Sequence, residues 1–359
     1  MPYVEEEIRS EQEQAEKPLE VSPKKQKKKP SLVWRIIGRV AAALGVVLLA
    51  FVVLVVGAVT VICKGPSQSA AEVFVNTVME TSAAKFVARI YYSEEEVNAI
   101  LRKYSVIETD EVTENTGPFN PIDETEKDDI IVEEVLGSTF RGRIMIIRDP
   151  SRVQVAALDV YDGRGGKRVE EFYADTGAIA AINAGGFEDA GGVGNGGTPL
   201  GIVIHDSKLL YGSRSSTSTV IGFDQNDVLV VGKMTGQQAL DRGLRDAVSF
   251  GPVFIVNGKM ADITGDGGGL NPRTVIGQRA DGTVLLLVID GRQASSLGAS
   301  YKDCAQIMLD YGAVNAANLD GGSSSMMMHN GEVLNVSSSL YGSRRLPDAI
   351  VVMPAAKGE

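Results

Sequence analysis

The chain has 359 residues and a formal net charge of −11, so it is long enough for one large domain or two ordinary ones. Ten Lys and Arg against seven Asp and Glu in the first 64 residues leave a net −14 on the remainder. So acidic a remainder argues against a general nucleic-acid-binding domain, which needs basic patches. Only Cys304 follows residue 64, so no intramolecular disulfide can stabilise this part.

The first part of the chain is predicted to be a tail and a membrane span. Residues 1–40 begin with a charged run that holds too little apolar surface to fold, so we expect a disordered cytoplasmic tail. The 23 residues 41–63 include no charged side chain and can form a helix across a bilayer. A buried core helix is a poorer interpretation, because the run lacks a polar face. A cleaved signal peptide is also poorer, because no A-x-A site follows the run.

The basic residues indicate the orientation of this span. Five lysines lie between residues 24 and 29, followed by Arg35 and Arg39, whereas Lys64 stands nearly alone after the span. The positive-inside rule then places the N-terminus in the cytoplasm and the rest of the chain outside. We therefore expect a single-pass protein of the cell membrane with an extracellular C-terminal domain.

Residues 64–138 are predicted to be a helical stalk followed by an acidic linker. Apolar residues recur at helical spacing up to about Lys103, and Ser93–Glu96 has the capping-box pattern that starts a helix. Residues 105–135 are acidic, contain two prolines and show little periodicity, which is typical of a linker. This segment is expected to hold the next domain away from the membrane.

Residues 139–359 are predicted to form one α+β domain, mostly antiparallel, with at least one β-α-β unit. Short β-branched runs alternate here with Gly, Asn and Asp, as strands alternate with turns. The best helix covers residues 301–311, which Ser300 caps and Gly312 ends. The strand-like runs "TVLLLVID" and "AVNAANLD" come before and after it.

Two aspartates end the runs that flank this helix, Asp290 and Asp320, and glycine follows each. If both strands are parallel in one sheet, the two carboxylates lie at the same edge, where such sheets bind ligands. The glycines would let the chain turn and leave backbone N–H groups open to a ligand. Either Asp-Gly pair alone is explained by a turn, but two around one helix predict a functional site.

Other polar stretches add to this hypothesis or narrow it. Arg273 precedes a buried-looking strand, and a guanidinium suits bidentate contact with phosphate, although a surface salt bridge is the alternative. The run "GVGNGG" at 192–197 has dinucleotide-motif spacing, but a strand follows it, so we expect a loop near the site. "DITGDGGG" lacks the oxygen ligands of a calcium loop, and two histidines make no zinc site. No metal and no cofactor is therefore predicted.

The motifs between residues 139 and 354 resemble the phosphodiester glycosidase family. The resemblance is carried by "AINAGGF", "GPVFIVNGK", "PRTVIG", "VLLLVIDGRQ", "GASYKDCAQIMLDYGAVNAANLDGGSSS" and "RRLPDAIVV". It implies a hydrolase that cleaves the glycosidic bond of sugar 1-phosphodiesters, with a phosphorylated glycan or sugar phosphate as substrate. The family's common D-G-G-G-S is D-G-G-S-S here, so its serine maps onto Ser323 or Ser324.

The resemblance also implies a set of site residues. Asp320 and Asp290 would be catalytic, because an oxocarbenium-like transition state needs nearby carboxylates. Arg273 and the N–H groups of Gly321 and Gly322 would stabilise the phosphate leaving group. The full substrate-binding set that the family pattern implies is Asn183, Gly185, Gly186, Arg273, Thr274, Asn318, Gly321, Gly322, Ser323, Ser324 and Arg345.

Two other functions stay open on the sequence. A non-catalytic module that binds phosphorylated glycans at the cell surface would keep the glycine loops and Arg273 but could dispense with Asp320. A Ser-His peptidase would need His329 beside one of the serines 323–325, and an orienting acid. The presence of both aspartates favours the enzyme over the binding module. The expected surface location and the family resemblance, and not the aspartates, are the basis for a role in cell-surface polysaccharide metabolism.

Overall fold

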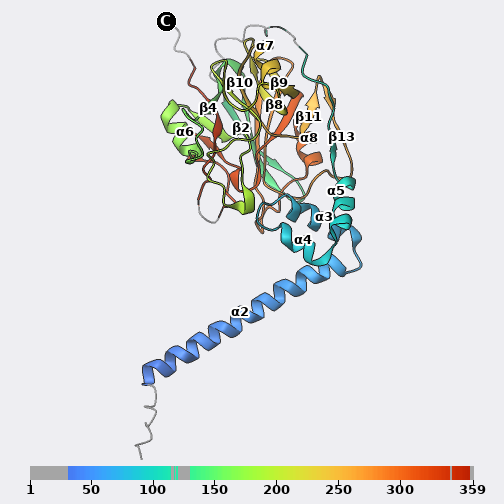
Figure 1. Cartoon of the computed structure of the whole chain (residues 1–359), viewed down its shortest axis with the longest axis vertical. Helices are drawn as coiled ribbons and strands as arrows, with labels where there is room; N and C mark the ends of the chain where they lie inside the picture. The colour runs from blue at the N-terminus through green and yellow to red at the C-terminus, as the bar shows by residue number, and fades with distance from the viewer. Residues whose placement is uncertain (1–30, 115–116, 118, 120–129, 340–341, 356–359) are drawn as a thin grey trace, which may run out of the picture. The chain divides into compact units, whose positions relative to one another are not determined.

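The computed structural model describes residues 31–114, 117, 119, 130–339 and 342–355 (Figure 1). The chain divides into two compact units, Met1–Val59 and Thr60–Glu359. The long helix α2 (Leu32–Lys64) includes the predicted span and begins nine residues before it. In the described part of the chain it is the one helix that is long and apolar enough to cross a membrane. Most of the predicted tail, residues 1–30, lies outside the described residues.

Three sheets form the β-rich part of the second unit. The first has the order β7-β6-β10-β8-β9, from β6 (Val203–His205), β7 (Lys208–Tyr211), β8 (Thr217–Asp224), β9 (Leu229–Thr235) and β10 (Leu244–Ser249). The second has the order β12-β11-β16-β14-β15-β3-β2, from β2 (Ile130–Leu136), β3 (Arg141–Ile147), β11 (Val253–Val256), β12 (Lys259–Met260), β14 (Arg273–Arg279), β15 (Val284–Ile289) and β16 (Ala313–Leu319). The third has the order β18-β17-β5-β19-β4, from β4 (Val153–Ala157), β5 (Ala180–Asn183), β17 (Met327–His329), β18 (Glu332–Val333) and β19 (Asp348–Val352). Neighbouring strands in all three sheets pair antiparallel, which confirms the predicted fold class.

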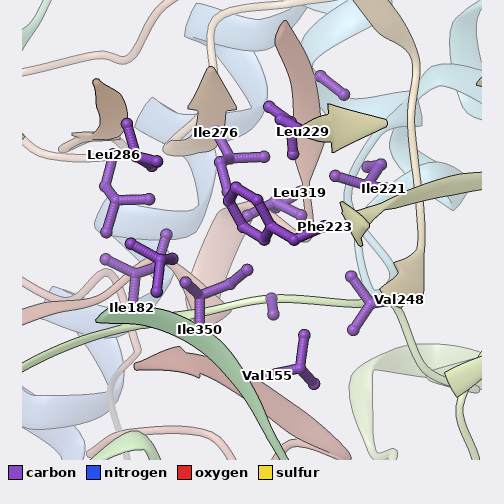
Figure 2. Close-up of a cluster of buried hydrophobic side chains, with 14 of the residues drawn as sticks. Val155, Ile182, Ile221, Phe223, Leu229, Val248, Ile276, Leu286, Leu319 and Ile350 are labelled. Atoms are coloured by element: carbon purple, nitrogen blue, oxygen red, sulfur yellow. The ribbon is translucent and has the colours of Figure 1, made fainter. Parts of the chain in front are cut away.

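The main hydrophobic core lies between these sheets (Figure 2). Each sheet contributes side chains to it, for example Phe223 of β8, Leu319 of β16 and Ile182 of β5, which are all fully buried. Burying a side chain of this size contributes about 1.5–3 kcal/mol. The second and third sheets are covered on both faces, which suits their apolar strands: the second sheet packs on helix α8 (Tyr301–Asp310) and the third on helix α6 (Val169–Thr176).

Helix α8 (Tyr301–Asp310) belongs to the predicted β-α-β unit. Ser300 caps it, and the side chain of Asp303 completes the capping box, as the sequence indicates. Strands β15 and β16, which α8 connects, both pair antiparallel with β14, so β14 lies between them. The two strands therefore run in the same direction without being neighbours, and their C-terminal ends reach the same edge of the sheet.

The helices expected between residues 67 and 103 are present as α3 (Gln68–Met79), α4 (Lys85–Tyr91) and α5 (Glu94–Lys103), with α6 (Val169–Thr176) and α7 (Gly236–Asp241) further on. The structure does not show them as a separate stalk. Ser105 and the two-residue strand β1 (Val106–Ile107) pair with Thr264 and β13 (Asp262–Ile263), and β2 already belongs to the seven-stranded sheet. The sequence predicts a domain that begins at residue 139, whereas the second compact unit begins at Thr60.

This difference has a physical reason. Helical periodicity shows that a helix has an apolar face, but not what covers that face. Here Val75, Ala88 and Val97 pack together into a small core of their own. The C-terminal turn of α3 then meets the loop before β14, where a Cβ on Gly269 would clash with the backbone of Thr77. Glycine at this position permits the close contact.

Candidate functional site

The C-terminal end of β16 and the N-terminal end of β14 open into a cavity of about 550 Å³. A volume of this size is typical of small-molecule sites. The wall includes residues of the strand ends and their loops, among them Asn271, Arg273, Arg292, Asn318, Asp320, Gly321, Gly322, Ser323, Ser324 and Arg344. The segment 79–83 and Lys85 form another part of the wall, together with Phe187, Asp189 and Tyr301.

The two-residue period of a strand decides which of the predicted residues reach this cavity. In β16, Leu319 faces the core between the sheets, so Asp320 is directed to the other face, into the cavity. In β15, Val288 faces the core between the sheets, so Asp290 continues on that side. The two aspartates share an edge of the sheet, as predicted, but they lie on opposite faces.

Asp290 is bound to a neighbouring loop rather than exposed in the cavity. Its Oδ1 accepts hydrogen bonds from the backbone N of Val336 at 2.9 Å and from Nδ2 of Asn335 at 3.3 Å. Burial raises the pKa of this carboxyl, and the two hydrogen bonds partly offset that effect. This geometry favours a role for Asp290 in holding the loop, in place of the catalytic role expected from the sequence.

Asp320 has an environment suited to proton transfer. The backbone N of Asp320 donates to the carbonyl of Ala184 at 2.9 Å, so the residue is fixed to the third sheet. Burial raises the pKa of its carboxyl to about 6, although the Ser324 hydroxyl and the charge of Arg344 act against the rise. A carboxyl with a pKa this close to neutrality, lining a cavity, is a candidate acid or base.

The two glycines that follow serve close packing and are not open N–H donors. The N–H of Gly321 donates to the carboxylate of Asp320, and that of Gly322 donates to the carbonyl of Pro272 at 2.9 Å. Gly322 has a φ of +62°, and a Cβ there would lie 3.1 Å from a guanidinium nitrogen of Arg292. The role expected for these N–H groups toward phosphate is therefore not available in this structure.

Arg273 lies at the predicted place, but its guanidinium is already paired. Nη2 contacts Oε2 of Glu80 and the carbonyl of Gly269, each at 2.6 Å, and Nε donates to the carbonyl of Ala299 at 3.0 Å. The guanidinium also stacks on the ring of Tyr301, 4.1 Å from its centroid. Glu80 therefore occupies the position at Arg273 that the sequence interpretation gave to a phosphate.

Two other arginines line the cavity, and neither was identified from the sequence. Arg344 forms an ion pair with Asp189 at 2.8 Å and donates to the hydroxyl of Ser323 at 3.2 Å. The predicted Arg345 is instead half-exposed outside the cavity, where it contacts Glu171 at 3.3 Å. Adjacent side chains point in different directions, so the one-residue difference decides which arginine reaches the site.

Arg292 is the second of these arginines. Its Nη2 donates to Oδ1 of Asn271 at 2.9 Å, and no carboxylate within the described residues forms an ion pair with it. Loss of surrounding solvent and the positive charge of Arg273 lower the pKa of Arg292. A bound anion would favour the charged form of Arg292 and so offset both effects. The "DGRQ" motif after β15 was the signal that could have identified this residue.

Several predicted binding residues support the site without lining the cavity. Oδ1 of Asn183 accepts from Thr274 Oγ1 at 2.8 Å and from the N of Met326 at 3.1 Å, and its Nδ2 donates to the carbonyl of Asp320. Asn183 and Thr274 therefore clamp the Asp320 loop from the opposite face of the sheet. The remaining such residues are Gly185, whose N–H donates to buried Asp348, and Gly186, which packs on Phe250.

Besides Arg273 and Asp320, the predicted polar residues Asn318, Ser323 and Ser324 reach the cavity wall. Nδ2 of Asn318 donates to the carbonyl of Gly251 at 2.9 Å, whereas its buried Oδ1 has no hydrogen-bond partner in the described part of the chain. His329 is not in the wall. It pairs with Ala180, the residue of β5 farthest from Asn183, so the serine-histidine contact of a peptidase is not formed.

Residues 176–353 match the family model described as phosphodiester glycosidase. The β-rich domain belongs to the phosphodiester glycosidase family. Its curated relatives include the N-acetylglucosamine-1-phosphodiester alpha-N-acetylglucosaminidase of Mus musculus, 26% identical over 226 residues, which are 56% of this chain and 42% of the relative. The bovine enzyme of the same name is 26% identical over 188 residues, 47% of this chain and 34% of the relative. The SPbeta prophage-derived protein YomE of Bacillus subtilis (strain 168) is 31% identical over 168 residues, 44% of this chain and 25% of YomE.

A solved phosphodiester glycosidase structure has the same fold. It is the zebrafish N-acetylglucosamine-1-phosphodiester alpha-N-acetylglucosaminidase catalytic domain, described as auto-inhibited by its pro-peptide. It is 19% identical, with a TM-score of 0.54, and the match covers 68% of this chain and 87% of the zebrafish chain. This chain spans less than half the length of each of these curated relatives.

Proposed function

We propose that this phosphodiester glycosidase domain hydrolyses the glycosidic bond of a sugar 1-phosphodiester. The observation that carries the proposal is the cavity, whose wall includes the carboxyl of Asp320 and the guanidinium of Arg292, and neither group forms an ion pair within the described residues. The two other carboxylates of the wall are already paired, Glu80 with Arg273 and Asp189 with Arg344. Asp320 is therefore the carboxyl free to act on a substrate.

The chemistry can proceed with one carboxylate. Asp320, ionised above about pH 6, takes a proton from a water molecule as that water attacks the anomeric carbon. The bond from this carbon to the phosphate oxygen breaks, and the phosphomonoester leaves with the bonding electrons. Phosphate is a weak base, so the leaving group needs charge stabilisation more than a proton. Arg292 supplies that stabilisation in a site where charge pairs are stronger than in water.

Arg292→Gln tests the anion-binding part of this proposal. Loss of a charge-assisted contact of about 1.5–3 kcal/mol should raise KM for a methyl phosphodiester of N-acetylglucosamine 1-phosphate by about 10- to 100-fold. Arg345→Gln is the matched control, because Arg345 is an arginine of the same domain outside the cavity. Steady-state kinetics of both variants would decide the matter. Unchanged KM and kcat in Arg292→Gln would remove Arg292 from the substrate site.

We also propose that the segment 79–85 limits access to the site. It lines the cavity, and Glu80 takes the place of an anion on Arg273. Auto-inhibition by a pro-peptide is described for the zebrafish domain, and a carboxylate that competes with the substrate phosphate would have a similar effect here. The cavity would then have a closed state, in which Glu80 pairs with Arg273, and an open state, in which Arg273 can bind the substrate phosphate.

Glu80→Gln should raise kcat/KM several-fold, because a neutral amide competes less well for Arg273 than a carboxylate does. Glu72→Gln is the control, since Glu72 lies in α3, directly before Glu80 in the fold, but pairs with Lys103 and Tyr104 away from the cavity. Kinetics and melting temperature should be measured on both. Lower activity of a normally folded Glu80→Gln protein would show instead that Glu80 positions Arg273.

We further propose that α2 anchors the protein in the cell membrane, with the N-terminus in the cytoplasm and the glycosidase domain outside. The apolar length of α2 and the basic residues before it support this orientation. The substrate would then be a phosphorylated glycan of the cell surface. Protease added to intact cells should digest the domain, and complete protection of the domain would contradict the orientation.

A further inference from the structure

Helix α4 presents an apolar, basic face that no part of the described chain covers. Phe86 is 62% exposed and Ile90 is 68% exposed, one helical turn apart. The exposed cations Lys85 and Arg89 lie beside them on the same face. The opposite face is buried, with Ala88 packed into the small core of α3 to α5.

The same helix is joined to the end of the proposed membrane span. Within the second unit, Thr60 Oγ1 and the hydroxyl of Tyr91 lie 2.8 Å apart, and Nζ of Lys64 donates to the carbonyl of Tyr91 at 2.8 Å. The hydroxyl of Tyr92 donates to the carbonyl of Cys63, and Lys64 lies 4.6 Å from the centroid of the Tyr92 ring. The position of α4 is therefore set by residues 60–64, where the apolar run ends.

We propose that α4 lies in the membrane–water interface, with Phe86 and Ile90 inserted at the level of the lipid headgroups. The inference rests on the membrane anchoring proposed above. Apolar and aromatic side chains on one face, flanked by basic ones, are the pattern of helices that lie on a bilayer. Lys64 and Lys85 are placed to contact anionic headgroups, which attract basic residues near a membrane. Arg89 lies 3.9 Å from the carboxylate of Glu94, and both side chains are exposed, so headgroups would compete for it in this pair. Tyr91 and Tyr92 suit the same depth, because tyrosine is enriched at this interface.

This placement matters for the glycosidase site. Lys85 is both the first residue of α4 and part of the cavity wall, in the segment that includes Glu80. A bilayer that holds α4 would therefore act directly on the wall of the cavity. The site would work on sugar phosphodiesters displayed at the membrane surface.

Lipid quenching of tryptophan fluorescence in the full chain tests the inference. The chain has one tryptophan, Trp34. In a Trp34→Phe background, Phe86→Trp places the probe on the exposed face of α4, and Val160→Trp places it at a matched control site that is 65% exposed in a loop. Both proteins are reconstituted into vesicles of phosphatidylcholine and phosphatidylglycerol, in which one lipid carries bromine near the top of its acyl chains.

We expect at least twofold stronger quenching for Phe86→Trp than for Val160→Trp. Equal quenching of the two would overturn the interfacial position of α4. Recovery of the protein away from the vesicles would overturn both the anchoring and this inference. Hydrolysis of the soluble methyl phosphodiester, measured on the same samples in detergent, reports on the proposed activity separately, so failure of one proposal is distinguishable from failure of the other.

Discussion

Asp320→Asn should lower turnover of a sugar 1-phosphodiester by about 10²–10⁴-fold, the usual contribution of a positioned acid or base. The fold should survive, because the amide is nearly isosteric with the carboxylate. The contacts that place the residue also remain, since Ala184 and Asn183 bind its backbone and not its side chain. In the wild-type enzyme, kcat/KM should rise as the pH rises through about 6, where Asp320 ionises.

The stability of this variant separates a catalytic carboxyl from a structural one. Folding raises the pKa of Asp320 to about 6, so the folded state binds its proton more tightly than the unfolded state does. Below the unfolded-state pKa of about 4, the bound proton stabilises the folded state fully. This stabilisation is lost as the pH rises through the folded-state pKa. At pH 7 the ionised carboxylate costs the fold on the order of 3 kcal/mol. Asp320→Asn should therefore melt at the same temperature as the wild type or higher at pH 7, with the gain absent near pH 4.

Asp290→Asn is the matched control for Asp320→Asn. Asp290 ends a strand at the same edge, but it binds the loop at Asn335 and Val336 outside the cavity. Its substitution should change turnover far less than Asp320→Asn does. Full turnover in a normally folded Asp320→Asn protein would show that Asp320 is not the catalytic carboxyl. Binding of the phosphodiester by the wild type without any turnover would support a module that binds phosphorylated glycans without cleaving them.

The face on which each aspartate lies could not be predicted from the sequence. Strand β15 reads "VLLLVI" and is buried on both sides, so no alternation of polar and apolar residues marks which side faces the helix. The pairing of β14 with β16 is a long-range contact that local patterns do not contain. What the sequence does show is local: Ser300 caps a helix, and Asp320 follows a strand and precedes two glycines.

The arginines illustrate the same limit. Arg273 was predicted to bind an anion, and it does, but the anion is Glu80, which lies 193 positions earlier in the chain. Arg344 and Arg345 are neighbours in one motif, and only the path of the loop before β19 decides that Arg344 enters the cavity. The position of the segment 79–85 at the site likewise depends on tertiary packing. Helical periodicity could not predict it, because periodicity does not show which part of the chain a helix packs against.

A fragment of residues 139–359 should fail to fold cooperatively, whereas a fragment of residues 65–359 should fold. The shorter fragment loses β2, which pairs with β3 along seven residues from Ile130 to Leu136. It loses Thr113, whose backbone N donates to the carbonyl of Val231 in β9 at 3.1 Å and whose Oγ1 accepts from the N of Val231 at 2.9 Å. The edge strand β3 would then expose a row of unpaired backbone groups, which favours aggregation.

Removal of Glu80 adds the largest single cost. Arg273 is only 4% exposed and would keep its charge after losing its carboxylate partner. Breaking a buried ion pair from one side costs about 3–5 kcal/mol, a large share of the 5–15 kcal/mol that stabilises a typical domain. Thermal unfolding and size-exclusion chromatography of the two fragments would test this directly. If the 139–359 fragment is monomeric and melts as sharply and as high as the 65–359 fragment, the segment before residue 139 is a dispensable stalk, and Glu80 contributes nothing to the stability of the glycosidase domain.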